Sequence, residues 1–192
     1  MDDFASAEKA LVVARHVAQT IGPDDLHRPT PCRDFDVEAL ADHLTDTIVR
    51  LGAAVAIEPT VPDGVSIDQQ IQRLTQPILA EWRRRGLARD VVFGGRTLPA
   101  HLALGTLCLE LLVHSWDFAV ALDRPFPVSD AHAAHVLGLA RQTLTAESRA
   151  IAGFDPPLPL PATASTLDQL IAFTGRDPQQ MNSTGQPPRR RR

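Results

Sequence analysis

The chain has 192 residues, of which 44% are hydrophobic and 22% charged, the balance of an ordinary soluble globular domain with a sizeable core. Its formal net charge of −4 gives no indication of nucleic-acid binding. The two cysteines are too few for a disulfide framework, and no uncharged apolar run reaches the roughly 18 residues of a membrane span. The acidic N-terminus has no apolar signal-peptide core, so we expect a cytoplasmic protein without a membrane partner.

Helical periodicity dominates the first half of the chain. Apolar residues three and four positions apart predict a first helix over 3–20, and Asp36 is a suitable N-cap for a second helix after a proline-rich break. Ser66 begins a capping box for a third helix, which Gly86 ends. Pro77 lies inside this third helix, and we expect it to kink or split the helix.

The second half of the chain adds one small irregular element and three further helices. β-Branched residues before Gly94 and Gly95 predict a small hairpin or an irregular connection. A proline suited to the first helical position begins a fourth helix over 99–122, and a serine N-cap begins a fifth over 129–148. After a proline-rich loop, a short last helix is expected over 165–175.

This pattern predicts an all-α fold, an antiparallel four-helix bundle with short additional helices, over residues 1–178. Residues 179–192 have the composition of a disordered, arginine-rich tail. Four terminal arginines without a basic domain are a weak indication of nucleic-acid contact, so we expect none. The residues do not decide the oligomeric state, and a homodimer stays open.

Glu110, His114 and Asp117 lie on one line of the apolar fourth helix, because helical neighbours are three and four residues apart. A buried carboxylate is costly unless it is paired, hydrogen-bonded or bound to a metal. Glu-x-x-x-His aims a carboxylate oxygen and an imidazole nitrogen at a common point, which supplies two of the three protein ligands of a catalytic-type zinc site. A plain Glu–His hydrogen bond, or an arginine partner for Glu110, explains the same spacing, and spacing alone favours these simpler explanations.

A third ligand would come from another part of the chain, and the residues alone do not choose it. His43 lies at the edge of the apolar stripe of the second helix, a position compatible with the interior or with exposure. Cys32 is a further candidate, in a proline-flanked loop, and Trp116 is interpreted as core or as a pocket wall. The remaining histidines are His16, His27, His101, His132 and His135.

Three stretches carry a resemblance in the same chain order: TPCRDFDVEALADH at 30–43, ELLVHSWDFAVAL at 110–122 and LDQLIAFTGRDP at 167–178. They resemble signatures of actinobacterial metal-binding proteins of the DinB-like superfamily, akin to the metal-binding domain of mycothiol-dependent maleylpyruvate isomerase. Phe35 stands where that group more often has tryptophan, and Ser115 where it has glycine; neither is a ligand position. The excess of arginine over lysine also suits a GC-rich actinobacterial genome.

The resemblance implies that His43, Glu110 and His114 bind one divalent ion, zinc in the first place, with nickel, iron and manganese as alternatives. Asp117 then either orients an imidazole or caps or pairs elsewhere. The resemblance also implies a transferase or isomerase that uses mycothiol, a small-molecule thiol, and acts on a small electrophile through a metal-bound thiolate. No catalytic residue beyond the ligands is identified.

Two other functions stay open at this point. The isomerase carries a further C-terminal domain that contributes to its active site, and residues 179–192 are too few to match it. The resemblance therefore supports the fold and the metal site better than the reaction. The alternatives are a non-catalytic metal-binding protein and a metal-dependent hydrolase that uses bound hydroxide.

Overall fold

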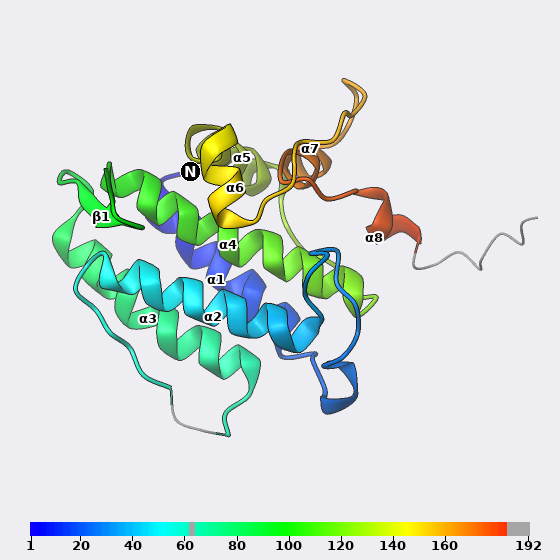
Figure 1. The fold of residues 1–192 in the computed structure, drawn as a ribbon, viewed down its shortest axis with the longest axis horizontal. Coiled ribbons are helices and arrows are strands. Elements are labelled where there is room, and N and C mark those ends of the chain that lie inside the picture. Colours follow the sequence, from blue (N-terminus) through cyan, green and yellow to red (C-terminus); the bar gives the residue numbers. More distant parts are fainter. Residues whose placement is uncertain (62–63, 184–192) are drawn as a thin grey trace, which may run out of the picture.

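The computed structural model describes residues 1–61 and 64–183, and this part of the chain is mostly helical with one small antiparallel sheet (Figure 1). The expected all-α class is confirmed at this level. The helices are α1 Asp3–Ala18, α2 Val37–Ala53, α3 Ile67–Arg85, α4 Ala100–Ala121, α5 Asp130–Thr143, α6 Ala146–Ala152, α7 Thr166–Phe173 and α8 Gln179–Ser183, with a 3-10 turn at Pro23–Asp25. The strands are β1 Val91–Phe93 and β2 Arg96–Leu98.

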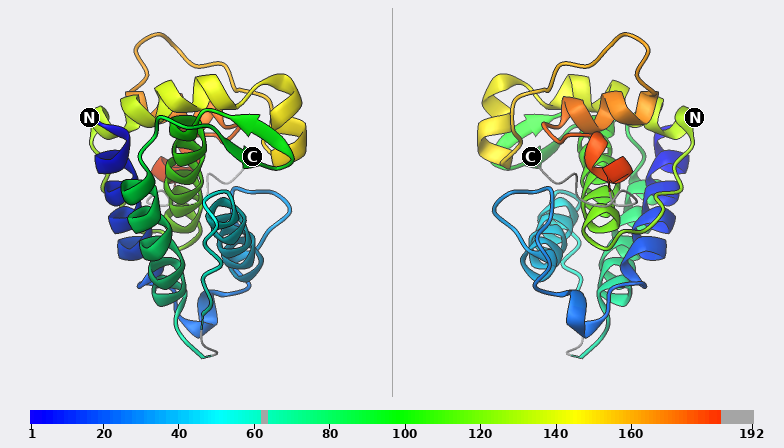
Figure 2. Two further views of the ribbon diagram at one scale, coloured as in Figure 1. Left: turned by 90° about the vertical axis from the view of Figure 1, so that its left-hand side faces the viewer. Right: turned by 90° about the vertical axis from the view of Figure 1, so that its right-hand side faces the viewer.

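The four long helices pack on one another around α4. Helix α1 contacts α3 and α4, and α2 contacts the same two helices. Helix α5 packs against α4 and α7, and Figures 1 and 2 show α5, α6 and α7 together on one side of the long helices. Helix α4 therefore lies between the other long helices and this additional layer.

Helix α4 is the central helix because it is apolar on all sides. Every residue from 107 to 119 is buried, including Glu110, His114 and Asp117. The helix is long and apolar enough to cross a membrane, but 89% of its most apolar 18-residue stretch is buried inside the protein. Such burial is typical of the core helix of a globular domain. The polar line expected on this helix therefore lies in the interior.

Capping chemistry explains several element boundaries. The Asp36 side chain accepts a hydrogen bond from the amide of Ala39 at 2.9 Å and begins α2. Gly86 ends α3 with φ of 72°, as expected. The predicted capping box at Ser66 is absent, because its hydroxyl donates to Asp68 instead and makes no cap bond.

Two other expectations about helices need revision. A split at Pro77 does not occur, because α3 runs as one helix from Ile67 to Arg85 and buries residues on both sides of the proline; a kink there stays a prediction. The packing of α3 against α1 and α2 outweighs the one backbone hydrogen bond that a proline removes. The predicted fifth helix is two helices, because α5 ends at Thr143 and the Thr145 hydroxyl caps the new helix α6.

The hairpin at Gly94 and Gly95 is confirmed. Val91 pairs with Leu98 and Phe93 with Arg96, and both turn glycines have positive φ. At the other end, the short helix α8 occupies 179–183, where the sequence predicts the start of a tail. The prediction for Arg189–Arg192 lies outside the described residues.

Candidate metal centre

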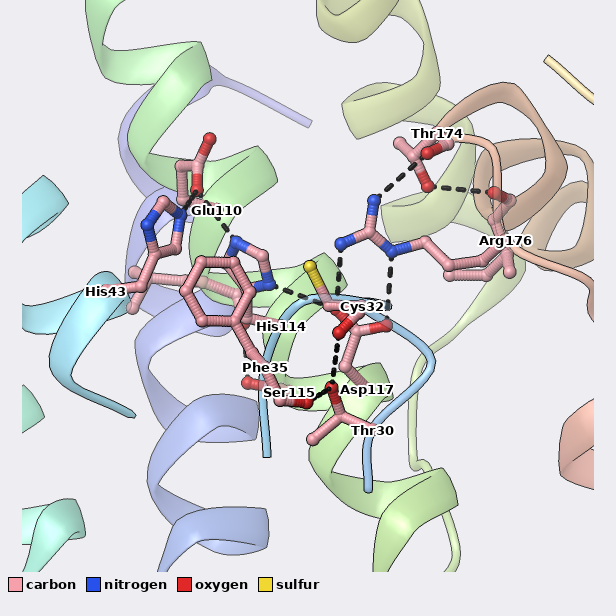
Figure 3. A network of polar contacts seen from close by, with 12 residues as sticks. Thr30, Cys32, Phe35, His43, Glu110, His114, Ser115, Asp117, Thr174 and Arg176 are labelled. Carbon is pink, nitrogen blue, oxygen red and sulfur yellow. Dashed lines mark hydrogen bonds and ion pairs between the residues drawn. The ribbon is translucent and has the colours of Figure 1, made fainter. Parts of the chain in front are cut away.

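Helices α2 and α4 bring His43, Glu110 and His114 together (Figure 3). His114 Nε2 lies 3.0 Å from Glu110 Oε2, and His43 Nε2 lies 4.0 Å from the same oxygen. The two imidazole rings meet edge to face, with centroids 5.2 Å apart and planes at 88°. One ring nitrogen from each histidine and one carboxylate oxygen lie within 4.8 Å of one another, so three potential ligand atoms converge on one point.

A carboxylate lies behind His114. The other ring nitrogen, Nδ1, is 3.0 Å from Asp117 Oδ2. Arg176 binds this carboxylate from the far side, with Nε donating to Oδ1 at 3.1 Å and Nη2 donating to Oδ2 at 2.9 Å. Arg176 Nη1 donates to the carbonyl of Thr174 at 3.0 Å. Asp117 therefore does both things that the sequence left open: it contacts an imidazole and it pairs with a cation from another segment.

The loop before α2 positions His43. Two hydrogen bonds to the carbonyl of Phe35, from the amide and the hydroxyl of Thr30, fold this loop back on itself. The Phe35 ring then lies against the His43 ring, with centroids 5.1 Å apart. His43 is the most accessible of the three donors, with 28% of its side chain exposed, against 6% for Glu110. The site is thus closed on the α4 side and open on the α2 side.

The pKa values of His43, Glu110 and His114 depend on one another because the three side chains are in contact. Burial alone lowers the pKa of His114, but hydrogen bonds to Asp117 and Glu110 outweigh it and raise the pKa above its ordinary value. Burial alone raises the pKa of Glu110, and the hydrogen bond and charge of His114 reverse this and lower it. Burial and the charge of His114 lower the pKa of His43. The two carboxylates thus favour the protonated form of His114, whereas burial and the charge of His114 favour the neutral form of His43.

A cavity of about 410 Å³ opens beside these donors and is called the polar cavity below. His43 and His114 line it together with Cys32 and Arg176. Its walls also include the loop 31–35 and the segment 152–155 after α6. Two histidine rings of the donor group thus face a space large enough for a small molecule.

One ion pair joins the two walls of the polar cavity. Arg33 Nη2 donates to Asp155 Oδ2, and the two side chains are 76% and 46% exposed. An exposed pair of this kind contributes roughly 0–1 kcal/mol. The walls are therefore connected by an interaction that opens at little cost.

The other expected residues lie elsewhere. Trp116 is buried, with 1% of its surface exposed, and is not among the residues that line the polar cavity, so the structure places it in the core. His135 pairs with Asp3 at 3.0 Å, and His132 is buried on α5. Within the described residues, none of His16, His27, His101, His132 and His135 belongs to a group of donors that could hold a metal.

Cys32, His114 and Asp117 form a second group of possible ligands, also within 4.8 Å of one another. Burial raises the pKa of the Cys32 thiol to about 11, so it is protonated near neutral pH. Both oxygens of Asp117 are already bound by Arg176. The set of His43, Glu110 and His114 is the better cation site because its carboxylate is not neutralised by a guanidinium.

Sequence reasoning missed Arg176 and the contribution of Cys32 to the cavity wall. Arg176 belongs to the stretch LDQLIAFTGRDP, but nothing local indicates that it folds back onto α4. The available signal was Asp117, since a buried carboxylate requires a cationic or hydrogen-bonding partner.

Fold and site together define a mostly helical protein with a buried group of side chains able to hold a metal ion. No family model and no solved structure matches the sequence. Two proteins of Mycobacterium tuberculosis are similar to it: Uncharacterized protein MT0763 of strain CDC 1551 / Oshkosh and Uncharacterized protein Rv0738 of strain ATCC 25618 / H37Rv. Each is 26% identical over 181 residues, covering 92% of this chain and 98% of the relative.

These relatives confirm the expected similarity to actinobacterial proteins and extend it over nearly the whole chain. Their names state no activity. The resemblance to the DinB-like superfamily therefore stays a prediction.

Proposed function

We propose that the protein binds one divalent metal ion through His43, Glu110 and His114 and uses it in a transferase or isomerase reaction between a low-molecular-weight thiol and a small electrophile. The observation that carries the metal site is the convergence of three donor atoms from two helices within 4.8 Å. In this proposal α1 to α4 form a DinB-like antiparallel four-helix bundle. The contacts of α1 and α2 with both α3 and α4 support that arrangement.

The chemistry of the donors fits a divalent ion. Two imidazoles and one carboxylate are a common ligand set for zinc, and nickel, iron and manganese accept it as well. His114 Nε2 and Glu110 Oε2 are 3.0 Å apart, so a proton shared between them would lie where the donors converge, and a bound cation would replace it. His114 then keeps its other proton on Nδ1, where Asp117 accepts it, an arrangement that commonly supports metal-binding histidines.

Charge favours an anionic partner for this site. Two neutral imidazoles and one carboxylate leave a divalent ion with a net charge of about +1. When bound, such an ion lowers the pKa of a thiol or a water molecule that approaches it and polarises an electrophile. The polar cavity places the approaching molecule against the His43 and His114 rings, and Phe35 excludes water from one face of His43.

A thiol cosubstrate such as mycothiol is proposed on two grounds. The first is the resemblance of residues 30–43 and 110–122 to proteins related to a mycothiol-dependent isomerase. The second is the polar cavity, whose charged walls suit a polar molecule better than an apolar one. The two free cysteines, Cys32 and Cys108, are consistent with a reducing compartment, so we place the protein in the cytoplasm.

Metal analysis of protein purified without a polyhistidine tag tests the site. We expect about one divalent ion per chain, and a large loss of it in each of His43→Ala, Glu110→Ala and His114→Ala. His16→Ala, an exposed histidine on α1, is the matched control and should keep the ion. Full metal content in all three ligand variants would refute the assignment.

A cobalt-substituted sample tests the thiol. Saturating mycothiol should add a sulfur-to-cobalt absorption band in the near ultraviolet, and His43→Ala should remove it. If the spectrum does not change while esters are hydrolysed without thiol, the protein is a metal-dependent hydrolase. If neither occurs, it is a non-catalytic metal-binding protein.

A further inference from the structure

A second cavity, of about 320 Å³, reaches the donor group from another direction and is called the apolar cavity below. Glu110 lines it, whereas His43 and His114 line the polar cavity. Ala152 and Phe154 line both cavities and so lie between them. The three donors are thus divided between two separate spaces, and the proposed thiol chemistry uses only one of them.

One face of α4 forms the base of the apolar cavity. Leu102, Thr106, Leu109 and Glu110 are spaced four, three and one residues apart, which places them along the same side of the helix. The carboxylate is the last of these four residues. A molecule that lies along this face therefore has its far end beside a proposed metal ligand.

The hairpin and the junction between α5 and α6 form the walls. The hairpin contributes Phe93 and Leu98, and the junction contributes Leu144, with Phe154 from the following loop. These side chains are aromatic or aliphatic, so the cavity suits an apolar molecule. The hairpin is too small to form a core of its own, and lining this cavity gives it a role.

Most side-chain hydrogen-bond donors that line the apolar cavity already have an acceptor within the protein. The Thr106 hydroxyl donates to the carbonyl of Leu102 at 3.0 Å, and the Thr143 hydroxyl donates to that of Leu139 at 3.1 Å. Gln142 donates to the Gly138 carbonyl, Thr145 to the Ser148 hydroxyl, and Ser148 to the Thr143 carbonyl. These groups therefore offer a ligand mainly acceptor oxygens, and the Thr97 hydroxyl, which also lines the cavity, lies on the exposed strand β2.

The apolar cavity also disfavours anions. A charged group inside it would lie mostly against apolar side chains, and burial of an unpaired charge is costly. The cation among the lining residues, Arg96, lies 3.6 Å from Glu147 and is 62% exposed, so its charge is paired and lies largely in solvent rather than inside the cavity.

We infer that the apolar cavity binds the apolar body of an uncharged electrophilic substrate, with its reactive end at Glu110. This inference rests on the proposed function, because it makes the polar cavity the thiol site and the apolar cavity the site of the second substrate. The two molecules then meet at the donor group from different sides. A carboxylated substrate is disfavoured in the apolar cavity because its charge would be buried mostly against apolar side chains.

A matched pair of ligands tests the charge preference. Methyl 1-naphthoate and 1-naphthoate share one ring system and differ in charge, and isothermal titration calorimetry measures the affinity of each for the full chain. We expect the ester to bind at least about tenfold more tightly than the carboxylate. Equal affinities, tighter binding of the carboxylate, or no binding of either ligand would overturn the inference.

Two cavity-filling variants locate the binding site. Leu102→Trp on α4 and Leu98→Trp on β2 enter the apolar cavity from different elements, and both residues are partly exposed. Each should weaken ester binding at least about tenfold, while Val12→Trp, at an apolar helix position that is 66% exposed, should leave it unchanged. Retained metal content and an unchanged circular dichroism spectrum show that a variant is folded. Undiminished ester binding in either folded variant would refute the site.

Ion-free protein, prepared with a chelator, separates this inference from the metal proposal. The apolar walls that hold the ring system do not depend on the ion, so the ion-free protein should still bind the ester more tightly than the carboxylate. In the cobalt protein, saturating ester should shift the visible bands, because it lies beside Glu110. Ester binding that leaves these bands unchanged would overturn the placement beside Glu110, whereas failure to bind metal would overturn the proposed function alone.

Discussion

Arg176 donates two hydrogen bonds to the carboxylate of Asp117, at 3.1 and 2.9 Å, although the two residues are 59 positions apart in the chain. Both side chains are buried: none of the Asp117 side chain is exposed, and 5% of the Arg176 side chain is. The pair connects the segment after α7 to the carboxyl-terminal part of α4, directly behind His114. A buried aspartate that could pair with several groups is thereby held in one orientation, and so is the imidazole in front of it.

Loss of this orientation should weaken metal binding. In Asp117→Asn the side chain keeps its shape but loses the negative charge that holds a proton on His114 Nδ1. We expect the affinity for zinc to fall by roughly 10–100-fold, as for other partners of metal-binding histidines. Competition with a chromophoric chelator measures the change. Asp42→Asn, at an exposed position on α2, is the control, and an equal loss in both variants would contradict the positioning role.

Removal of the arginine should destabilise the fold more than it affects the site. Arg176→Met leaves Asp117 buried with His114 as its remaining cationic partner, and it removes a guanidinium that lies 5.1 Å from the Phe154 ring. Breaking a buried pair in this way costs about 3–5 kcal/mol of the free energy of unfolding. Urea denaturation should show this loss for Arg176→Met. Arg33→Met, which breaks the exposed pair with Asp155, should cost at most about 1 kcal/mol.

Metal binding should release a proton near neutral pH. The raised pKa of His114 favours a proton on Nε2 that a cation must displace, whereas the lowered pKa of His43 favours a ring that is already neutral. The affinity for zinc should therefore rise with pH until the pH passes the raised pKa of His114. Calorimetry in buffers with different ionisation heats should give about one proton per ion. No proton release at pH 6.5 would contradict this assignment.

Protonation of His114 competes with metal binding, but it stabilises the fold when no ion is bound. Because the folded pKa of His114 lies above its ordinary value of 6.5, its contribution to stability is fully present below about pH 6.5. This contribution is lost as the pH rises through the folded pKa. Zinc-loaded protein should not show this loss, since the ion replaces the proton, and thermal unfolding at several pH values measures the difference.

Much of the fold follows from local sequence signals. The N-cap at Asp36, the terminating Gly86 and the turn at Gly94 and Gly95 each depend on nearby residues, and the structure places each element boundary close to its signal. The exceptions depend on tertiary packing. Pro77 indicated a kink or a split of α3, and packing overrides the split, whereas Thr145 began a helix where the periodicity predicted a continuation of α5.

In the candidate site, too, the sequence predicts contacts within one helix but not contacts that depend on tertiary packing. Glu110 and His114 lie on one helix, so their spacing alone predicts that they meet. His43 depends on how α2 packs against α4, and it entered the prediction through a resemblance rather than through periodicity. Arg176 could not be found in either way, because its contact with Asp117 depends on how the chain returns after α7.

The return of the chain after α7 depends on a glycine. Gly175 has φ of 85°, and a Cβ atom there would lie 2.4 Å from the Asp155 Cβ. Gly153 has a similar φ of 73° but no neighbouring atom within 4 Å. We expect Gly153→Ala to cost about 1–2 kcal/mol from backbone strain and Gly175→Ala clearly more, because the Asp155 segment must also move. Urea denaturation compares the two variants, and equal costs would show that the close contact is unimportant.

The chain's own thiols should not replace an external one. Burial raises the pKa of Cys32 from 9.0 to about 11, only partly offset by the charge of Arg176, and raises that of Cys108 to about 12. At pH 7.5 the thiolate fraction of Cys32 is then about 100-fold below that of an ordinary cysteine, and the thiolate is the reactive form. Iodoacetamide should therefore alkylate native Cys32 about 100-fold more slowly than the same residue in urea, as followed by mass spectrometry, with Cys32→Ser to assign the adduct. Rapid alkylation of the native protein would instead make Cys32 a candidate nucleophile in the polar cavity. Slow alkylation would indicate that the thiol which reacts in the polar cavity comes from solution and not from Cys32.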